Sequence, residues 1–270
     1  MDAEERWDRL CRGAGFAPDP ETGRDLVRRW SEPHRRYHGL SHLLHALAEI
    51  EGAAPLLRDP PAASLALWFH DAVYDTRARD NEERSAALFD RWAERAGLAP
   101  DRAGRIRRWI LATRHAGGAA AGDDGDFVLD ADLAILGEDP ATFAAYERGV
   151  REEYGWAGER EFRGGRARVL RSFLDRPAIY RTARFRERFE ADARRNLGES
   201  LARLESRGPC LTCRRPLPPE APHAPFCCDR CRLLDLGRWA KEEYTVGRPL
   251  RPDEVPEAGD DPGEAPDPRG

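Results

Sequence analysis

Five of the six cysteines fall within a window of 22 residues, from Cys210 to Cys231. Cys210 and Cys213 form one pair, and Cys227, Cys228 and Cys231 form a second group. Two short cysteine turns joined by a loop supply the four corners of a tetrahedral zinc site, because each turn brings two thiolates to one ion. A segment this short buries too little apolar surface to fold alone. We therefore expect one bound Zn²⁺ to hold it together, with either Cys227 or Cys228 as a ligand.

Composition limits the class of protein. The chain has 270 residues, a net charge of −5 and a hydrophobic content of 40%, which predicts one or two domains with a real core. The acidic balance argues against electrostatic binding of nucleic acid by the whole chain. The charged N-terminus lacks the apolar stretch of a secretory signal, and no run reaches the length of a membrane span. Because the cysteines are spaced for a metal, we expect a cytoplasmic protein without a membrane partner.

The apolar pattern divides the chain into three parts. Residues 1–206 carry apolar side chains at helical spacing and predict an all-helical domain. Residues 207–250 contain the cysteines and form a small zinc-finger module of the ribbon or knuckle kind. Residues 251–270 are rich in proline and acidic side chains, which predicts a disordered acidic tail. The expected fold class is therefore mainly α.

A second metal-ligand pattern lies in the helical part. His70 and Asp71 close an apolar helical run, His38 lies upstream of them, and Asp132 lies downstream. Two imidazoles and two carboxylates suit a mid-row divalent ion such as Mn²⁺, Fe²⁺, Co²⁺ or Ni²⁺, with coordination positions left open for water and substrate.

Five stretches around these residues carry a family pattern: Glu32–His42, Trp68–Asp75, Asp80–Ser85, Leu111–His115 and Leu129–Gly137. Through them, residues 31–205 resemble the HD-domain superfamily, and within it the bacterial predicted metal-dependent HD phosphohydrolases. The resemblance implies an all-α fold and a divalent ion on His38, His70, Asp71 and Asp132. It also implies hydrolysis of a small phosphate ester, such as a nucleotide.

The catalytic roles around this metal are hypotheses from residue type and position. Asp75 lies one helical turn beyond Asp71 and is a candidate general base, or else a helix-end charge. Arg114 and His115 are candidates for contact with the phosphate, since guanidinium forks match phosphate oxygens.

The remaining basic side chains near the motif have less defined roles. Arg35 and Arg36 are further candidates for phosphate binding. His34, His42 and His45 are expected to support the site or to lie on the surface. An alternative is that the HD part is catalytically silent.

The cysteine module has a family pattern of its own, carried by Pro209–Cys213, Pro225–Trp239 and Glu242–Tyr244. Through these stretches, residues 210–244 resemble the small zinc-binding DNA gyrase inhibitors of the YacG type, which also end in an acidic tail. The resemblance implies Zn²⁺ on Cys210, Cys213, Cys227 and Cys231, and its spacing favours Cys227 over Cys228. It also implies binding to the gyrase B subunit, which keeps gyrase off DNA.

Two functions are therefore expected on one chain: a phosphohydrolase and a gyrase inhibitor. Four thiolates leave no open position on the zinc, so that metal is structural and function lies on the module's surface. The carboxylates of the tail repel DNA but suit a basic surface that grips DNA, so we expect no direct DNA binding. The alternatives are a protein that is only a gyrase-binding inhibitor, or a zinc module that binds nucleic acid.

Overall fold

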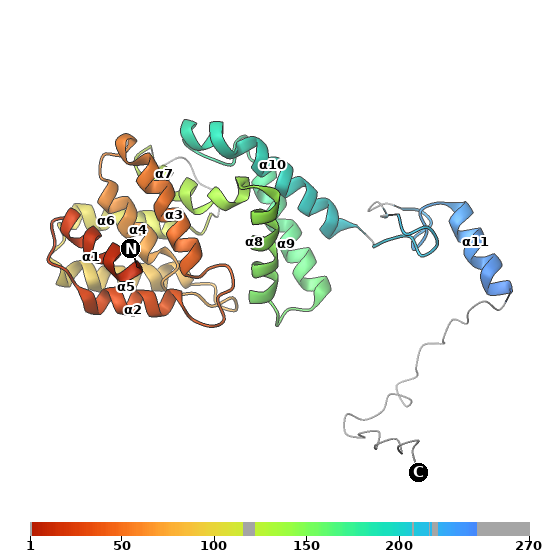
Figure 1. Ribbon diagram of the computed structural model, residues 1–270, viewed down its shortest axis with the longest axis horizontal. Helices are drawn as coiled ribbons and strands as arrows, with labels where there is room; N and C mark the ends of the chain where they lie inside the picture. Colours follow the sequence, from red (N-terminus) through yellow and green to blue (C-terminus); the bar gives the residue numbers. More distant parts are fainter. Residues whose placement is uncertain (1, 116–121, 207, 216, 218–220, 242–270) are drawn as a thin grey trace, which may run out of the picture. The chain divides into compact units, whose positions relative to one another are not determined.

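The computed structural model describes residues 2–115, 122–206, 208–215, 217 and 221–241. It divides into two compact units, Met1–Glu205 and Ser206–Gly270 (Figure 1). The acidic tail predicted over residues 251–270 lies outside the described residues. Within those residues the elements are helices and turns, in keeping with the expected mainly α class. None of the described helices combines the length and the apolar character that crossing a bilayer requires.

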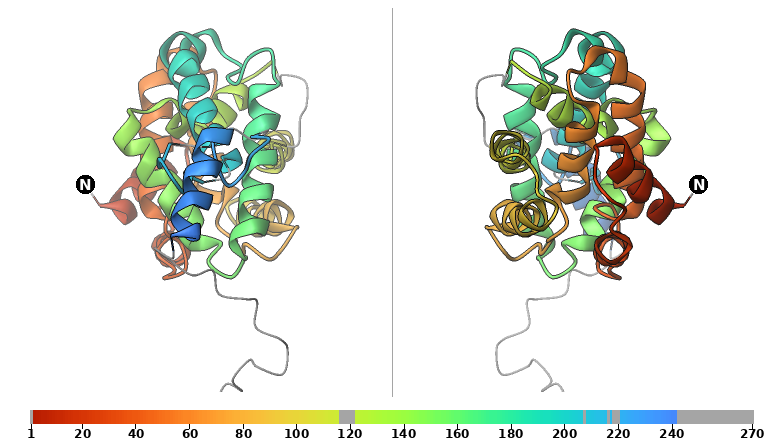
Figure 2. Two further views of the ribbon diagram at one scale, coloured as in Figure 1. Left: turned by 90° about the vertical axis from the view of Figure 1, so that its right-hand side faces the viewer. Right: turned by 90° about the vertical axis from the view of Figure 1, so that its left-hand side faces the viewer.

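The first unit is built from the following helices, in chain order: α1 (Ala3–Gly13), α2 (Pro20–Trp30), α3 (Leu40–Ala53), η1 (Ala54–Leu56), α4 (Pro60–His70), α5 (Asn81–Arg95), α6 (Pro100–Ala112), α7 (Gly125–Asp132), η2 (Ala134–Gly137), α8 (Pro140–Glu153), α9 (Glu159–Leu174) and α10 (Ala183–Glu205). Figure 2 shows α5 and α6 end-on and side by side, and α10 packs on both α9 and η2.

Several helix starts follow from the local sequence. An aspartate caps the first turn of α1, α2, α4 and α8, because its side chain accepts a hydrogen bond from a backbone N–H that has no partner in the helix. In α2, α4 and α8 a proline follows at the first helical position, where its fixed φ favours the helix. Helix α5 begins at Asn81, and Phe127–Leu129 lies within α7.

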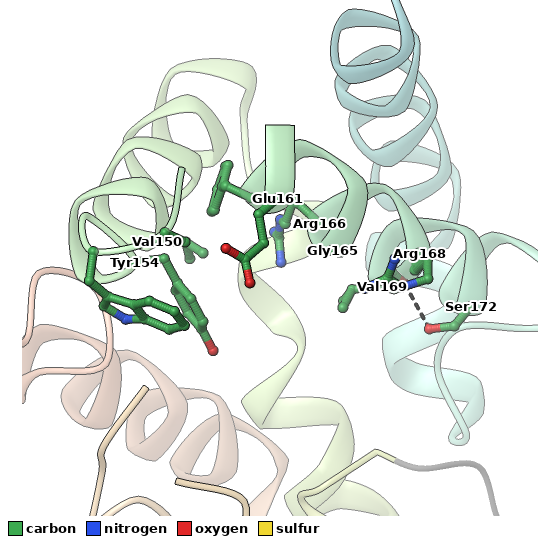
Figure 3. A pocket seen from close by; sticks show the side chains of 11 residues that line it. Val150, Tyr154, Glu161, Gly165, Arg166, Arg168, Val169 and Ser172 are labelled. Carbon is green, nitrogen blue, oxygen red and sulfur yellow. Dashed lines mark hydrogen bonds between the residues drawn. The ribbon is translucent and has the colours of Figure 1, made fainter. Parts of the chain in front are cut away.

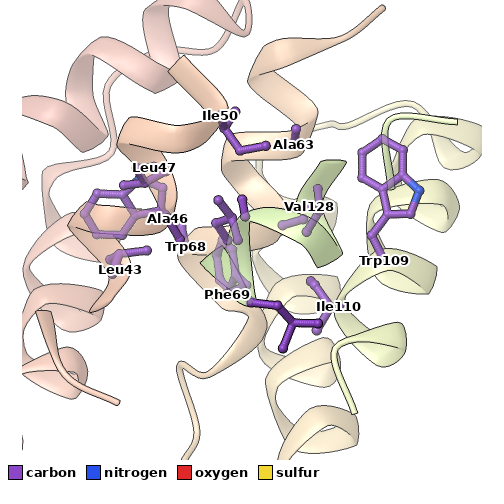
Figure 4. Packing of buried hydrophobic residues seen from close by; sticks show 14 of the residues in the cluster. Leu43, Ala46, Leu47, Ile50, Ala63, Trp68, Phe69, Trp109, Ile110 and Val128 are labelled. Atoms are coloured by element: carbon purple, nitrogen blue, oxygen red, sulfur yellow. The ribbon is translucent and has the colours of Figure 1, made fainter. Parts of the chain in front are cut away.

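Helix α4 forms the centre of the first unit. Its side chains from Ala62 to His70 are buried, with Ser64 as the half-buried exception, so this helix is covered on all sides. Trp68 and Phe69 pack with residues of α3, α6 and α7 (Figure 4). Because α4 ends at His70, the packing of this buried helix fixes the position of the His70–Asp71 pair.

The second unit has a very small core in its described part. Cys210, Leu217, Ala221 and Cys231 are its buried residues, with Phe226 packed against them. Two turns around the cysteines are followed by α11 (Asp229–Ala240). A core of this size supplies too little apolar burial for stability, so the unit needs an additional cross-link.

Candidate metal centres

Four side chains from three helices converge in the first unit, and we call them the histidine–aspartate cluster. His42 lies in the first turn of α3, His70 ends α4, Asp71 follows it, and Asp132 ends α7. The Nε2 atom of His42 is 3.3 Å from Nε2 of His70 and 3.1 Å from Oδ1 of Asp132. The Nε2 atom of His70 is 3.4 Å from a carboxylate oxygen of each aspartate.

Contacts on the far side of each ring orient the two imidazoles. Nδ1 of His70 donates to the carbonyl of Leu67 at 2.8 Å. A carbonyl only accepts, so in the neutral ring the lone pair is on Nε2 and faces the aspartates. The hydroxyl of Tyr37 is 3.0 Å from Nδ1 of His42 and orients that ring. Such partners are typical of metal-ligating histidines.

A cavity of about 390 Å³ opens on this cluster, and we call it the cluster cavity. Asp71 and Asp132 line it, whereas the side chains of His42 and His70 are only 2% and 1% exposed. The carboxylates therefore face the cavity and the imidazoles lie behind them. An ion held here would have coordination positions directed toward the cavity, as catalytic sites require.

The electrostatics of the cluster fit a cation. Burial alone would lower the pKa of His70, but the carboxylates of Asp71 and Asp132 outweigh it and raise that pKa to about 9. Burial lowers the pKa of His42. Burial would raise the pKa of Asp132, but His70 and His115 hold it well below its usual range. A divalent ion competes with the proton on His70, and two nitrogens with two carboxylates suit a mid-row ion.

The structure places His42, rather than the expected His38, among these ligand atoms. Those of His42, His70 and Asp71 all lie within 4.8 Å of one another, and His38 is not in that group. His38 precedes α3, its Nδ1 donates to Glu153 at 2.7 Å, and its ring stacks on Tyr74. It lines the cluster cavity from the side. The carboxylate of Glu153 is the physical reason for the difference, because it turns His38 toward α8.

Two of the three residues expected to be catalytic line the cluster cavity. Nε2 of His115 lies 2.8 Å from Oδ2 of Asp132. Arg114 also lines the cavity, but its guanidinium is paired with Glu82 and Glu83. A phosphate would have to compete with these two carboxylates for Arg114.

Asp75 does not belong to the lining of the cluster cavity. Its carboxylate accepts the backbone N–H of Arg77 at 2.9 Å, and its own backbone is held by the side chain of Asn81. Asp75 therefore stabilises the turn before α5 and lies apart from the position expected of a general base.

Arg35 and Arg36 also have structural partners. Arg35 is buried and donates to the backbone carbonyls of His38, Asp71 and Ala72, so it joins the segment before α3 to the end of α4. Its donors are used internally and none is directed to a phosphate. Arg36 is exposed and lies 3.8 Å from Glu152.

His34 and His45 lie outside the cluster. Nε2 of His34 is 3.1 Å from the carbonyl of Tyr74. His45 forms a separate group with Glu49 and Glu138, in which Arg188 also donates to Glu49 at 2.6 Å. Arg188 neutralises one carboxylate, and an internal ion-pair network accounts for this group.

Glu153 is a site residue that the sequence pattern did not reveal. One oxygen of its carboxylate accepts the backbone N–H groups of Arg36, Tyr37 and His38 at 2.8–2.9 Å. The other accepts from Nδ1 of His38 and from the hydroxyl of Tyr74. Burial alone would raise the pKa of this carboxyl, but His38 and the backbone N–H groups lower it to about 2.

The second centre is formed by four cysteines of the second unit. The Sγ atoms of Cys210, Cys213, Cys227 and Cys231 all lie within 4.8 Å of one another. Sγ of Cys227 is 3.5 Å from that of Cys213 and 3.6 Å from that of Cys231. Cys228 is exposed and is not part of this group.

The electrostatics of the four thiols favour binding of a cation. Desolvation alone would raise the pKa of Cys210, but the backbone N–H groups of Cys213, Cys227 and Thr212 lower it to about 6. The neighbouring thiol of Cys213 raises the pKa of Cys227 to about 11. Four thiolates so close together repel one another unless a metal binds them, and a four-cysteine set is a closed structural Zn²⁺ site. The residues present therefore fit zinc.

Comparison with known proteins identifies the second unit only. The model of the family described as DNA gyrase inhibitor YacG matches residues 209–257, which include the four cysteines. No solved structure matches the chain. The HD-domain resemblance of residues 31–205 gains no support from these comparisons and stays a prediction.

Each match to a curated relative spans a short part of this chain and more than half of the length of that relative. The DNA gyrase inhibitor YacG of Aeromonas salmonicida is 47% identical over 49 residues, which are 17% of this chain and 77% of that protein. The YacG protein of Pseudomonas fluorescens is 50% identical over 46 residues, 16% of this chain and 67% of that protein. That of Ralstonia nicotianae is 51% identical over 39 residues, 14% of this chain and 55% of that protein.

The first prediction concerns Glu153. Its pKa is about 2 in the folded protein and ordinarily 4.5, so the carboxylate contributes its full stabilisation above about pH 4.5. That contribution, about 2–3 kcal/mol, should be lost as the pH falls toward 2. Glu153→Ala should lower the free energy of unfolding of the first unit by about 3 kcal/mol at pH 7, because it leaves buried N–H groups without an acceptor.

Urea unfolding at pH 7 and at pH 3, followed by circular dichroism, measures both effects. Glu152→Ala is the matched control, because the neighbouring side chain is 62% exposed and should change stability by less than about 0.5 kcal/mol. Equal losses in the two variants, or a Glu153 contribution independent of pH, would contradict the prediction.

The second prediction concerns the fourth zinc ligand. Cys227→Ser should abolish tight binding of one Zn²⁺ per chain, because its Sγ lies within the four-cysteine group. Cys228→Ser should leave the zinc in place. Zinc content by mass spectrometry after dialysis against a weak chelator measures both. Loss of zinc in Cys228→Ser with retention in Cys227→Ser would assign the ligand to Cys228.

Proposed function

Because the chain belongs to the DNA gyrase inhibitor YacG family through residues 209–257, we propose that its second unit binds the B subunit of DNA gyrase and keeps gyrase off DNA. The observation that carries this proposal is the four-cysteine cluster lying within the matched segment. The zinc serves to fold the unit, since four thiolates leave no position for a substrate. Inhibition then depends on the surface that the zinc holds in place.

The surface of the second unit supports a protein partner. Leu233, Leu234 and Leu236 on α11 are each about half exposed, and so is Leu211 beside the first cysteine. Leu233 and Leu236 are three residues apart and lie on one face of the helix. Neighbouring exposed leucines on a small unit are typical of a surface that another protein covers.

The charge of the chain favours a protein partner over DNA. Residues 246–270 carry seven carboxylates and three arginines, and the whole chain has a net charge of −5. Carboxylates repel a phosphate backbone, but they complement a basic protein surface that normally grips DNA. A nucleic-acid-binding zinc module remains the alternative that the following experiment tests.

The third prediction tests the gyrase proposal with the full chain. It should bind the gyrase B subunit, inhibit supercoiling and show little affinity for duplex DNA. Replacing both Leu233 and Leu236 by alanine should weaken binding by at least about tenfold, because each truncation at an interface costs on the order of 1 kcal/mol.

The matched control is Leu56→Ala, since Leu56 is an equally exposed leucine in the first unit. Calorimetry measures binding, and gel assays of supercoiling measure inhibition. Tight DNA binding without any effect on gyrase would overturn the proposal, and so would a loss of binding in Leu56→Ala equal to that of the double variant.

A second function is proposed for the first unit: metal-dependent hydrolysis of a phosphate ester, as the HD-type motif implies. The observation in its favour is the histidine–aspartate cluster at the wall of the cluster cavity. When bound, a divalent ion would polarise a phosphoryl oxygen and acidify water. Tyr37 orients His42, and His115 contacts Asp132, so the chain fixes the geometry of its ligands.

Arg79 is the cation best placed to meet a phosphate. It lines the cluster cavity, and no ion pair is recorded for it within the described part of the chain. Arg114, in contrast, already has two carboxylate partners. We therefore assign recognition of the anionic end of a substrate to Arg79.

The fourth prediction tests the hydrolase proposal. Asp132→Asn should remove one divalent equivalent and lower phosphate release by at least about 100-fold, because it removes a carboxylate ligand from the cluster. Asp75→Asn is the control and should retain activity, since Asp75 lies outside the cavity lining.

Metal content by mass spectrometry and phosphate release from a panel of monoesters with Mn²⁺, Fe²⁺, Co²⁺ or Ni²⁺ measure the outcome. Circular dichroism verifies the fold of each variant. A wild-type chain that binds zinc alone and releases no phosphate would overturn the proposal and leave a gyrase-binding inhibitor with a catalytically silent first unit.

A further inference from the structure

A second cavity of about 490 Å³ lies between α8 and α9, and we call it the aromatic cavity. Three aromatic side chains line it, Tyr154, Trp156 and Phe162, together with the aliphatic side chains of Val150 and Val169. Figure 3 shows Val150 and Tyr154 on one side of this space, facing Gly165 and Val169 of α9 across it. Cavities of this size with apolar walls are where proteins bind small molecules.

The aromatic cavity adjoins the cluster cavity. Tyr154, Arg166 and Val169 line both, so the two spaces share a wall. The cluster cavity holds the carboxylates of Asp71 and Asp132, whereas the aromatic cavity holds no metal-ligating group of the cluster. A molecule with one polar end and one apolar end would find a matching wall for each end in these two neighbouring cavities.

The aromatic wall is held in place by its own contacts. The indole N–H of Trp156 donates to the hydroxyl of Thr76 at 2.8 Å, and the guanidinium of Arg77 lies 5.2 Å from the centre of its ring. The ring of Tyr154 lies 6.0 Å away. Trp156 is nevertheless 45% exposed, so a fixed apolar surface faces solvent. A preorganised wall of this kind binds a ring without a further loss of conformational entropy.

The charged groups near the shared wall indicate which cavity each end of a ligand would occupy. Arg166 is nearly buried there, but its guanidinium is used by Glu147 and by the hydroxyl of Tyr146. It therefore offers no strong attraction for an anion within the aromatic cavity. Glu161 and Arg168 also line the aromatic cavity and bring it one charge of each sign, whereas Arg79 and the metal-ligating cluster lie on the side of the cluster cavity. The anionic end of a ligand belongs on that side and the apolar end between α8 and α9.

We propose that the aromatic cavity binds the ring of a phosphate monoester whose alcohol is aromatic and largely apolar, while its phosphate lies at the histidine–aspartate cluster. This inference rests on the proposed hydrolase function, and it assigns the substrate class. Burial of a ring against Tyr154, Trp156 and Phe162 would favour such esters over esters of small alcohols. Trp156 and Val169 are the specificity-determining residues.

The fifth prediction compares esters that share a phosphate and differ in the alcohol. The full chain should bind and hydrolyse 1-naphthyl phosphate with a KM at least about tenfold below that of ethyl phosphate. Trp156→Ala should raise the KM for naphthyl phosphate about tenfold and so remove most of its advantage over ethyl phosphate. Val169→Phe, which narrows both cavities from α9, should also weaken binding of naphthyl phosphate. Leu56→Ala, outside both cavities, is the control.

Binding is measured separately from hydrolysis, by calorimetry with naphthyl phosphate and with 1-naphthol. If Trp156→Ala and Val169→Phe both weaken binding of naphthyl phosphate but no ester is hydrolysed, the aromatic cavity is supported and the hydrolase proposal fails. If esters are hydrolysed with equal KM and neither variant changes this, the hydrolase stands and the inference is overturned. A nucleoside monophosphate in the same panel shows whether a polar heterocycle is accepted equally, which would overturn the apolar class.

Discussion

The buried carboxylate of Glu153, at the end of α8, accepts three consecutive backbone N–H groups in segment 36–38 and two side-chain donors. That segment leads directly into α3, so the contact determines where α3 begins and thus where His42 lies. Arg35 acts from the other side, because its guanidinium binds carbonyls both before α3 and at Asp71. A buried charge is tolerated only with partners of this kind. These two charged side chains therefore join the segments that carry the histidine–aspartate cluster to one another.

The four-cysteine centre and the candidate metal centre of the first unit differ in access. Each gathers groups that can hold a cation: two carboxylates beside buried imidazoles in the first unit, and four thiols in the second. The four thiols use all tetrahedral positions and leave none for chemistry. The aspartates of the cluster instead line a cavity of about 390 Å³. This difference in access is why we propose a structural role for one metal and a catalytic role for the other.

Local patterns were predictable from the sequence, and long-range contacts were not. The cysteine pairs lie on short turns, so the spacing of Cys210 and Cys213 already indicates that both thiols reach one ion. Helical periodicity likewise predicts the helices of the first unit. The choice between His38 and His42 depends on Glu153, which lies 115 residues beyond His38 and reaches it only in the folded protein. Residue spacing does not reveal that contact. It does not reveal the cavity between α8 and α9 either.

For the proposed substrate class, the charges of the two cavities would determine how each end of the ligand binds. Without a cation, the cluster carries one positive charge on His70 and negative charges on Asp71 and Asp132, so it repels a phosphate dianion. A divalent ion held by His42, His70, Asp71 and Asp132 would compete with the proton of His70 and offset the two carboxylates, so binding of cation and anion would be thermodynamically linked there. The aromatic cavity stabilises a ring by burial of apolar surface, which does not depend on the charge of the cluster. The ring and the phosphate of one ligand should therefore respond differently to metal removal: affinity for the phosphate falls, and affinity for the ring persists.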